Sequence, residues 1–169
     1  MKCVGLRTIT GCARADCTMS VFYFAYGSNM DPQRVAARGL RFEHVCGAML
    51  HGVALAFDKQ SRAHHGSGHA NLAFDRTAAV EGVLYQLRGA DEIVHMDAFE
   101  AAPINYSRDV VMVSVAGRSV AAWTYFANAA VIHPGLRPQR AYLAHLLAGR
   151  PYLSQGYFDR LSQIQCVDD

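Results

Sequence analysis

The sequence has little lysine and no long apolar run. Only Lys2 and Lys59 are lysines, and the formal net charge of the 169 residues is +2 at pH 7. A chain so near neutrality, without a basic run, offers no surface for a polyanion, so no nucleic-acid partner is predicted. No segment reaches the roughly 20 apolar residues that a membrane-spanning helix needs, so no membrane partner is predicted. The fourteen arginines indicate a bias of genome composition rather than a phosphate site.

Cysteine is also sparse, and its spacing excludes the usual zinc patterns. An odd number of cysteines with no paired spacing favours unpaired thiols in a reducing compartment, so a cytoplasmic protein is predicted. Cys46 lies in an apolar, strand-like run, where a thiol is predicted to be a small buried side chain. The five cysteines are Cys3, Cys12, Cys17, Cys46 and Cys166.

What the chain does have is apolar material for one core. Hydrophobic residues make up 51% and charged residues 18%, which is far from a disordered composition and fits one domain. Residues 1–18 lack periodicity and are predicted to be a disordered tail or an overlong start, with 19–169 as the single domain. A lipoprotein-type anchor at Cys12 is not expected, because Arg7 interrupts the segment before it.

Residues Val21 to Met30 organise the rest of the prediction. Six apolar or aromatic residues in a row favour a buried strand, which breaks into Gly27, Ser28 and Asn29. Asp31 and Pro32 then suit the cap and first position of a helix. Such a strand–loop–helix junction directs unpaired backbone N–H groups at anions or carbonyl oxygens, although a loop that only turns the chain has the same pattern.

Alternation and turn residues predict the remaining elements of a mixed α/β (α+β) domain. Gly39 ends the first helix, and Ala116 and Gly117 turn a hairpin. Residues 59–69 are predicted to be a polar loop. The predicted strands cover 41–58 (two strands, or one bent strand with bulges), 70–74, 79–87, 107–115 and 118–127. The predicted helices cover 31–38, 91–101, 139–147 and 155–164.

Two motifs, in order and at a specific spacing, resemble the gamma-glutamylcyclotransferase-like (AIG2-like) family. The first is Tyr26-Gly27-Ser28-Asn29-Met30 after an aromatic strand, and the second runs from Met96 to Arg108 and contains Phe99-Glu100 and Pro103. Trp123-Thr124-Tyr125 is similar to a late aromatic strand of the family, and the order of elements matches from Val21 to about Ala148. The resemblance implies a small, twisted, barrel-like sheet with surrounding helices.

Glu100 is the candidate catalytic residue. It ends its helix, where the negative pole of the dipole opposes a carboxylate, and its neighbours are apolar, so its pKa should be raised towards the range of a general acid/base. The alternative is an exposed or salt-bridged glutamate, for example one paired with Arg108. The family usually has glycine after this glutamate. Here Ala101 follows, and the helix is expected to end by another route, such as one residue later before Pro103.

The resemblance further implies a reaction. The α-amine of a small-molecule γ-glutamyl amine or dipeptide attacks its own γ-carbonyl and releases 5-oxoproline and a free amine, with no metal or cofactor. Glu100 would carry both proton transfers. The implied substrate-binding residues are Tyr26, Gly27, Ser28, Asn29, Tyr106 and Tyr125.

Several alternatives remain open at this stage. His64, His65 and His69 could suggest a metal, but no acidic or cysteine ligand lies near them at zinc-like spacing, and a loop beside the mouth of the site is favoured. Ser28 lacks the surroundings of a hydrolase nucleophile. A non-catalytic binding module of the same fold, and a biosynthetic cyclotransferase with a larger leaving amine, are the competing functions. The sequence leaves the leaving amine and the oligomeric state open.

Overall fold

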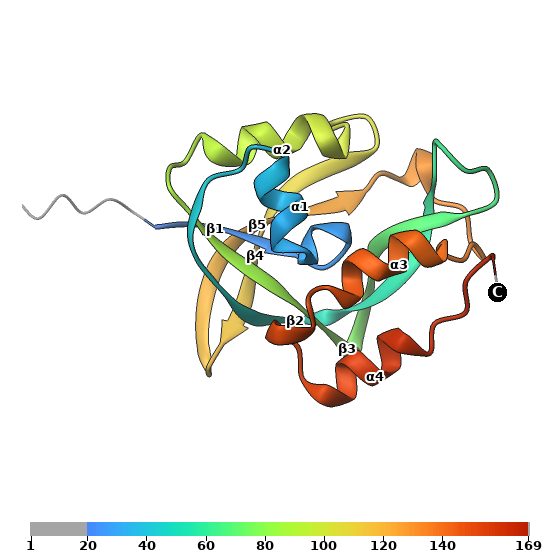
Figure 1. Ribbon diagram of the computed structural model, residues 1–169. Coiled ribbons are helices and arrows are strands. Elements are labelled where there is room, and N and C mark those ends of the chain that lie inside the picture. The colour runs from blue at the N-terminus through green and yellow to red at the C-terminus, as the bar shows by residue number, and fades with distance from the viewer. Residues whose placement is uncertain (1–19, 169) are drawn as a thin grey trace, which may run out of the picture.

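Five strands close into a barrel in the order β1-β3-β2-β4-β5 (Figure 1). The structure is a computed structural model, and it describes residues 20–168. The first strand, β1 (Val21–Ala25), lies between two others: it pairs antiparallel with β3 (Gly68–Leu87) and parallel with β5 (Arg118–Ala127). The sheet is completed by β2 (Phe42–Gln60) and β4 (Tyr106–Val115). The predicted mixed α/β class and barrel-like sheet are confirmed.

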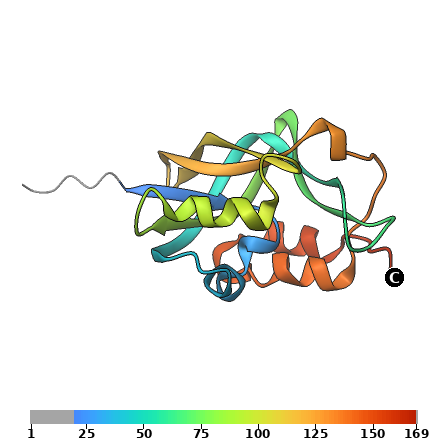
Figure 2. The same ribbon diagram turned by 90° about the horizontal axis from the view of Figure 1, so that it is seen from above.

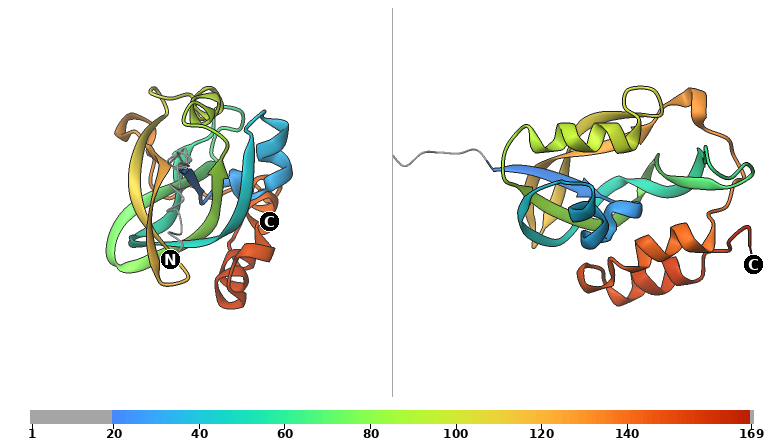
Figure 3. Two further views of the ribbon diagram at one scale, coloured as in Figure 1. Left: turned by 90° about the vertical axis from the view of Figure 1, so that its left-hand side faces the viewer. Right: turned by 45° about the horizontal axis from the view of Figure 1, so that its top comes forward.

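The helices lie outside the barrel, on different sides of it. Figures 2 and 3 show α2 along one side, with α3 and α4 together along another. The four helices are α1 (Pro32–Ala37), α2 (Glu92–Glu100), α3 (Arg140–Leu147) and α4 (Gln155–Ser162). Three short 3-10 turns complete the described part: η1 (Ser28–Met30), η2 (Ala129–Val131) and η3 (Arg150–Tyr152). All four helices were predicted, with ends that differ by one or two residues.

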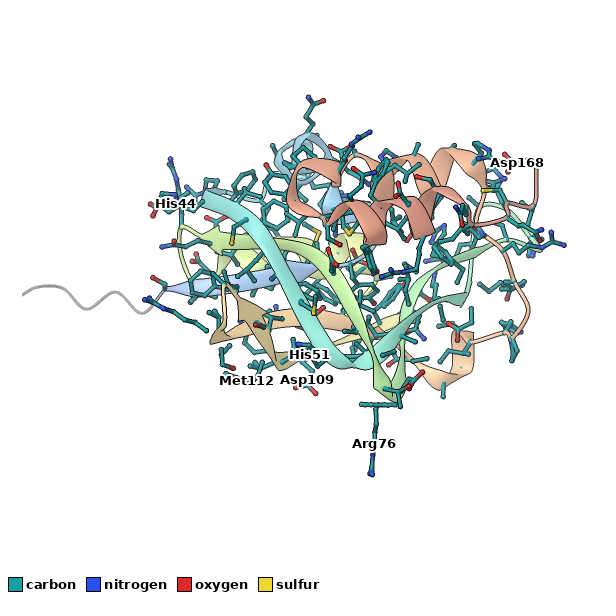
Figure 4. The ribbon with its side chains drawn as sticks, turned by 90° about the horizontal axis from the view of Figure 1, so that it is seen from below. His44, His51, Arg76, Asp109, Met112 and Asp168 are labelled. Atoms are coloured by element: carbon teal, nitrogen blue, oxygen red, sulfur yellow. The ribbon has the colours of Figure 1, made fainter. Side chains whose placement is uncertain are left out.

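The second and third strands are longer than predicted. The predicted loop 59–69 shrinks to 61–67, because Lys59 still belongs to β2 and His69 already belongs to β3. Asp75 to Ala78, which separated two predicted strands, are part of β3. They have no partner in register on β2 and form a bulge opposite Gly52, whose φ is +79°. Arg76 projects away from the barrel at this bulge (Figure 4).

The core fills the barrel and the space under the helices. Phe24, Val83 and Tyr85 are fully buried between the strands, and Leu143 and Leu146 bury the inner face of α3. This clustering follows the predicted alternation of β3 and the amphipathic pattern of α3.

The prediction that Cys46 is buried is wrong. The Cys46 thiol is free and exposed, whereas Cys166 is buried. Phe42 and Val45 in the same run are partly buried against the core, whereas Glu43, His44 and Cys46 are exposed, so the apolar run alone does not tell which of its side chains are covered. The predictions for residues 1–18, including Cys3, Cys12 and Cys17, lie outside the described residues.

Candidate active site

An inner cavity of about 30 Å³ lies where the first strand ends, and its walls come from distant parts of the chain. It contains every residue that the sequence analysis singled out for substrate binding, together with Glu100. Three further residues, Tyr23, Ala70 and Tyr142, complete the wall. The lining residues are Tyr23, Tyr26, Gly27, Ser28, Asn29, Ala70, Glu100, Tyr106, Tyr125 and Tyr142.

The loop after β1 has the predicted form of strand, tight loop and helix start. The Asp31 carboxylate accepts hydrogen bonds from the backbone N–H groups of Gln33 and Arg34, which caps α1. Gly27 sits where the loop passes close to its neighbours. A Cβ at this position would lie 3.1 Å from the Ala70 Cβ and 3.2 Å from the Tyr142 hydroxyl, which is tighter than ordinary contact. Glycine therefore allows this close approach.

The side chain of Asn29 joins the loop to Glu100. It is 3% exposed, and its Nδ2 donates to Glu100 Oε1 at 2.9 Å and to the Tyr23 hydroxyl at 2.8 Å. Its Oδ1 accepts from Arg38 at 2.7 Å, and its backbone carbonyl accepts from the Tyr85 hydroxyl at 2.7 Å. Both ends of the amide are engaged, so its orientation is determined. The sequence analysis had assigned only the backbone of Asn29.

Glu100 is placed by the way its helix ends. Ala101 adopts the left-handed conformation, with φ +48°, so the expectation that the helix ends by another route is wrong. The N–H of Ala102 bonds to the carbonyl of Asp97 and that of Ala101 to the carbonyl of Ala98, which is the Schellman arrangement that glycine usually makes. The chain thus turns sharply just after Glu100, which leaves its side chain pointing into the inner cavity.

Burial raises the pKa of Glu100, and Arg38, Asn29 and Lys59 partly oppose that shift by stabilising the charged form. Arg38 lies 3.6 Å from Oε1, while Oε2 has no hydrogen-bond partner among the described residues. The suggested partner Arg108 bonds instead to Asp97, at 3.0 Å. Among the described residues, Glu100 therefore has one carboxyl oxygen held by the protein and one without a hydrogen-bond partner.

Three tyrosines of the wall donate hydroxyl hydrogen bonds to other groups of the protein. Tyr26 donates to the carbonyl of Tyr125 at 2.6 Å, Tyr106 to the carbonyl of Ala70 at 2.9 Å, and Tyr125 to Asp97 Oδ1 at 2.7 Å. Burial raises the pKa of all three. They are thus both core aromatics and cavity wall, and they stay neutral near pH 7.

A larger outer cavity, of about 440 Å³, adjoins the inner one and shares Ser28, Glu100, Tyr106 and Tyr142 with it. Cationic side chains from α1 and its C-cap, from β2 and from the loop after β2 line it: Arg34, Arg38, Lys59 and Arg62. The sequence analysis missed these residues and Tyr142. The amphipathic pattern of residues 139–147 was a signal that could have indicated Tyr142. No local sequence pattern predicts that the four cationic residues lie together.

The histidine loop borders the outer cavity through His64 and His69, while His65 is exposed. His69 stacks on Tyr142 at a ring distance of 4.4 Å. Burial, together with the nearby charges of Lys59, Arg34 and His64, lowers its pKa to about 4, so it is neutral at pH 7. Among residues 20–168, no three His, Cys, Asp or Glu side chains gather as metal ligands would. Within the same range, no hydrogen bond joins Ser28 to a histidine.

Comparison with known proteins gives a family match and several similar structures. The sequence profile of the family described as "Gamma-glutamyl cyclotransferase, AIG2-like" matches residues 23–145. No curated protein matches the sequence in a direct comparison. Over the described part of the chain, no helix is long and apolar enough to cross a membrane.

Three solved structures share the fold. One described as "Gamma-glutamyl cyclotransferase" has a TM-score of 0.76 and 23% identity, covering 89% of this chain and 90% of its own. The uncharacterized protein loc79017 from Homo sapiens has a TM-score of 0.77 and 24% identity, with the same coverages. YkqA from Bacillus subtilis has a TM-score of 0.74 and 22% identity, covering 88% of this chain and 56% of its own.

Proposed function

Because the chain belongs to the gamma-glutamyl cyclotransferase, AIG2-like family, we propose that it converts γ-glutamyl amines or dipeptides into 5-oxoproline and a free amine. One observation carries the proposal. A largely buried carboxyl group with a raised pKa, Glu100, whose side chain is 17% exposed, lines the inner cavity together with Gly27 and Ser28. A general base and a possible oxyanion site thus lie at one cavity.

The first step forms the ring. The substrate's α-amine attacks its own γ-carbon, the new C–N bond closes a five-membered ring, and the carbonyl π electrons move onto oxygen. Glu100 takes the proton that the amine loses, through Oε2, since Asn29 already holds Oε1. Backbone N–H groups of the loop from Gly27 to Asn29 would stabilise the oxyanion.

The second step breaks the original amide bond. The oxyanion reforms the carbonyl, the bond to the leaving nitrogen breaks, and Glu100 returns its proton to that nitrogen. The two products together contain all the atoms of the substrate, so no water is consumed. No covalent enzyme intermediate and no metal are needed, because the nucleophile is tethered to its target and proximity supplies much of the rate.

The aromatic wall suits this reaction. Tyr23, Tyr26, Tyr106 and Tyr125 are each no more than 6% exposed, and they surround the carboxyl group. A dry wall favours a bent substrate over an extended one that exposes its carbonyl to water, and it strengthens the contacts of the oxyanion. The free thiol of Cys46 fits a reducing compartment, so we place the proposed reaction in the cytoplasm.

The test is direct. We expect 5-oxoproline, detected by mass spectrometry, when the protein is incubated with a panel of γ-glutamyl amines and dipeptides. The same compounds acetylated on the α-amine are the matched control, because their nucleophile is blocked, and they should give no product. Release of glutamate instead of 5-oxoproline would identify a hydrolase. Binding without any product would favour a non-catalytic module.

A further inference from the structure

Lys59 is a buried cation without an acidic partner in contact. The residue is 3% exposed, and its ammonium group lies 5.6 Å from the ring centre of Tyr106. No hydrogen bond or ion pair joins this ammonium group to any of the described residues. Burial lowers its pKa, the nearby charge of Arg62 lowers it further, and Glu100 opposes this shift. Burying a charged ammonium group without a counter-ion lowers the stability of the fold, unless another group neutralises the charge.

The outer cavity that Lys59 lines carries an excess of positive charge. Arg34, Arg38 and Arg62 line it as well, and Glu100 is the one acidic side chain in its wall. Arg38 is already engaged with Asn29 and Glu100. The other nearby carboxylate, Asp31, caps α1 and lies 3.3 Å from His145 Nδ1. The positive charge of Lys59 is therefore left for a ligand.

We propose that this outer cavity binds an anionic group, a carboxylate, on the leaving half of the substrate. The substrates would then be γ-glutamyl amino acids or peptides rather than γ-glutamyl polyamines. The inference rests on the proposed function and assigns a part of the substrate that the reaction itself leaves undefined.

The arrangement of the two cavities supports this assignment. Glu100 lines both, so a γ-carbonyl placed beside it has the glutamyl half on one side and the leaving half on the other. The inner cavity, of about 30 Å³, is small and enclosed by tyrosines, whereas the outer one, of about 440 Å³, has room for an amino acid. A carboxylate there would gain a charge-assisted hydrogen bond from Lys59. The ammonium group of a γ-glutamyl polyamine would instead be repelled by the positive charges of the cavity.

The wild-type protein gives the first test, with three substrates that differ in one group. They are γ-glutamylalanine, its C-terminal amide, and the γ-glutamyl derivative of 1,4-diaminobutane. We expect kcat/KM to be about tenfold or more higher for the acid than for the amide, the size of one charged hydrogen bond, and lowest for the diamine. Equal values for acid and amide, or a preference for the diamine, would overturn the inference and leave the proposed function standing. If none of the three gives 5-oxoproline, both fail.

Lys59→Met is the second test, since it removes the charge and keeps most of the length of the side chain. We expect the acid-to-amide ratio of kcat/KM to fall about tenfold towards one. Arg118→Met is the matched control, because it removes a cation from the exposed start of β5, and it should keep the wild-type ratio. An unchanged ratio in a folded Lys59→Met protein, judged by its melting temperature, would contradict the role of Lys59. If Lys59 instead bound the glutamyl α-carboxylate, the wild-type protein would already show equal kcat/KM for acid and amide. The wild-type panel therefore distinguishes that case from the inference.

Discussion

The amide of Asn29 donates a hydrogen bond to Glu100 Oε1 at 2.9 Å, and so connects the loop after the first strand to the end of α2. The same amide accepts from Arg38 through its other end. The contact holds one carboxylate oxygen, while Oε2 has no hydrogen-bond partner among the described residues. A base that moves a proton twice within one turnover needs such a fixed position.

Glu100→Gln tests the acid/base role, because glutamine has nearly the same shape but cannot exchange the proton. Turnover should fall by roughly 10²- to 10⁴-fold, about 3 to 5.5 kcal/mol of barrier, while substrate still binds. The measurement is kcat, with binding followed by calorimetry. Glu43→Gln, at an exposed glutamate, is the matched control and should behave as the wild type.

The same variant should hold or gain stability. Since burial raises the pKa of Glu100, the folded state binds its proton more readily than the unfolded state does. The charged side chain therefore weakens the fold above the unfolded pKa, and this penalty disappears as the pH falls below it. Glutamine should raise the melting temperature more at pH 7 than at pH 4. A destabilised variant with near-normal turnover would refute the assignment of Glu100.

The pH dependence of kcat/KM should reveal the raised pKa. The reaction needs the ionised carboxylate, so activity should fall on the acid side with a midpoint above 4.5, the ordinary value for glutamate. Arg38 stabilises that charge, so Arg38→Met should move the midpoint to higher pH. Arg118→Met, which removes a remote cation, should leave it in place. An unshifted or lower midpoint in Arg38→Met would show that another group controls the acid side.

Gly27→Val should harm function more than stability. Its β-branched side chain restricts the backbone and meets Ala70 and Tyr142, at the place where the loop's N–H groups line the inner cavity. The loss of one oxyanion donor typically costs about 3 kcal/mol of barrier, so turnover should drop by roughly two orders of magnitude. Gly156→Val serves as control, since its added Cβ meets nothing closer than 3.9 Å. Normal turnover in a folded Gly27→Val protein would mean that the loop only turns the chain.

Ala101→Gly should stabilise the protein. Ala101 has φ +48°, where a Cβ costs about 1 kcal/mol and glycine costs nothing, although glycine loses more entropy on folding. A net gain of about 0.5 kcal/mol, or roughly 1–2 °C in melting temperature, is expected. Ala116, with φ +47° in the exposed turn between β4 and β5, gives a matched variant, Ala116→Gly, which should gain a similar amount. A loss of stability only in Ala101→Gly would show that the methyl group packs usefully beside Glu100.

Treatment with a chelator should leave activity intact, because the proposed steps use only proton transfer and fixed dipoles. The measurement is 5-oxoproline release before and after incubation with a chelator and removal of the metal–chelator complex. Activity that is lost and then restored by zinc would overturn the mechanism and direct attention to His64 and His69 at the outer cavity.

The sequence predicts the elements whose signals are local. The strand, cap and helix around Asp31 could be read because every determinant lies within a few residues. The full length of β3 could not be predicted, because exposed polar residues such as Asp75 interrupt its apolar pattern. They form a bulge that is defined only by the pairing of β3 with β2. Cys46 was misjudged for a related reason, because burial depends on where the barrel is covered and not on the run of apolar letters.

For the candidate site, the motifs placed Glu100 beside the loop, but its partners could not be predicted. Arg108, close in sequence, bonds to Asp97, whereas Arg38, from the end of α1, reaches Glu100. Which arginine contacts Glu100 depends on how α1 and α2 pack in the folded protein. The burial of Lys59 likewise arises from the packing of β2 under Tyr106, which no local pattern shows.

The parallel pairing of the first and last strands has a consequence for synthesis. The hydroxyl of Thr124 on β5 donates to the carbonyl of Phe24 on β1 at 2.9 Å, across 100 positions of the chain. On the ribosome, β1 emerges early and must wait until β5 has been translated before the barrel can close. A nascent chain that stops before β5 therefore has the loop and Glu100 but lacks the strand that encloses them. The candidate site is therefore completed late in translation. Until then the unfinished barrel exposes unpaired sheet edges, which is when protection by a chaperone matters most.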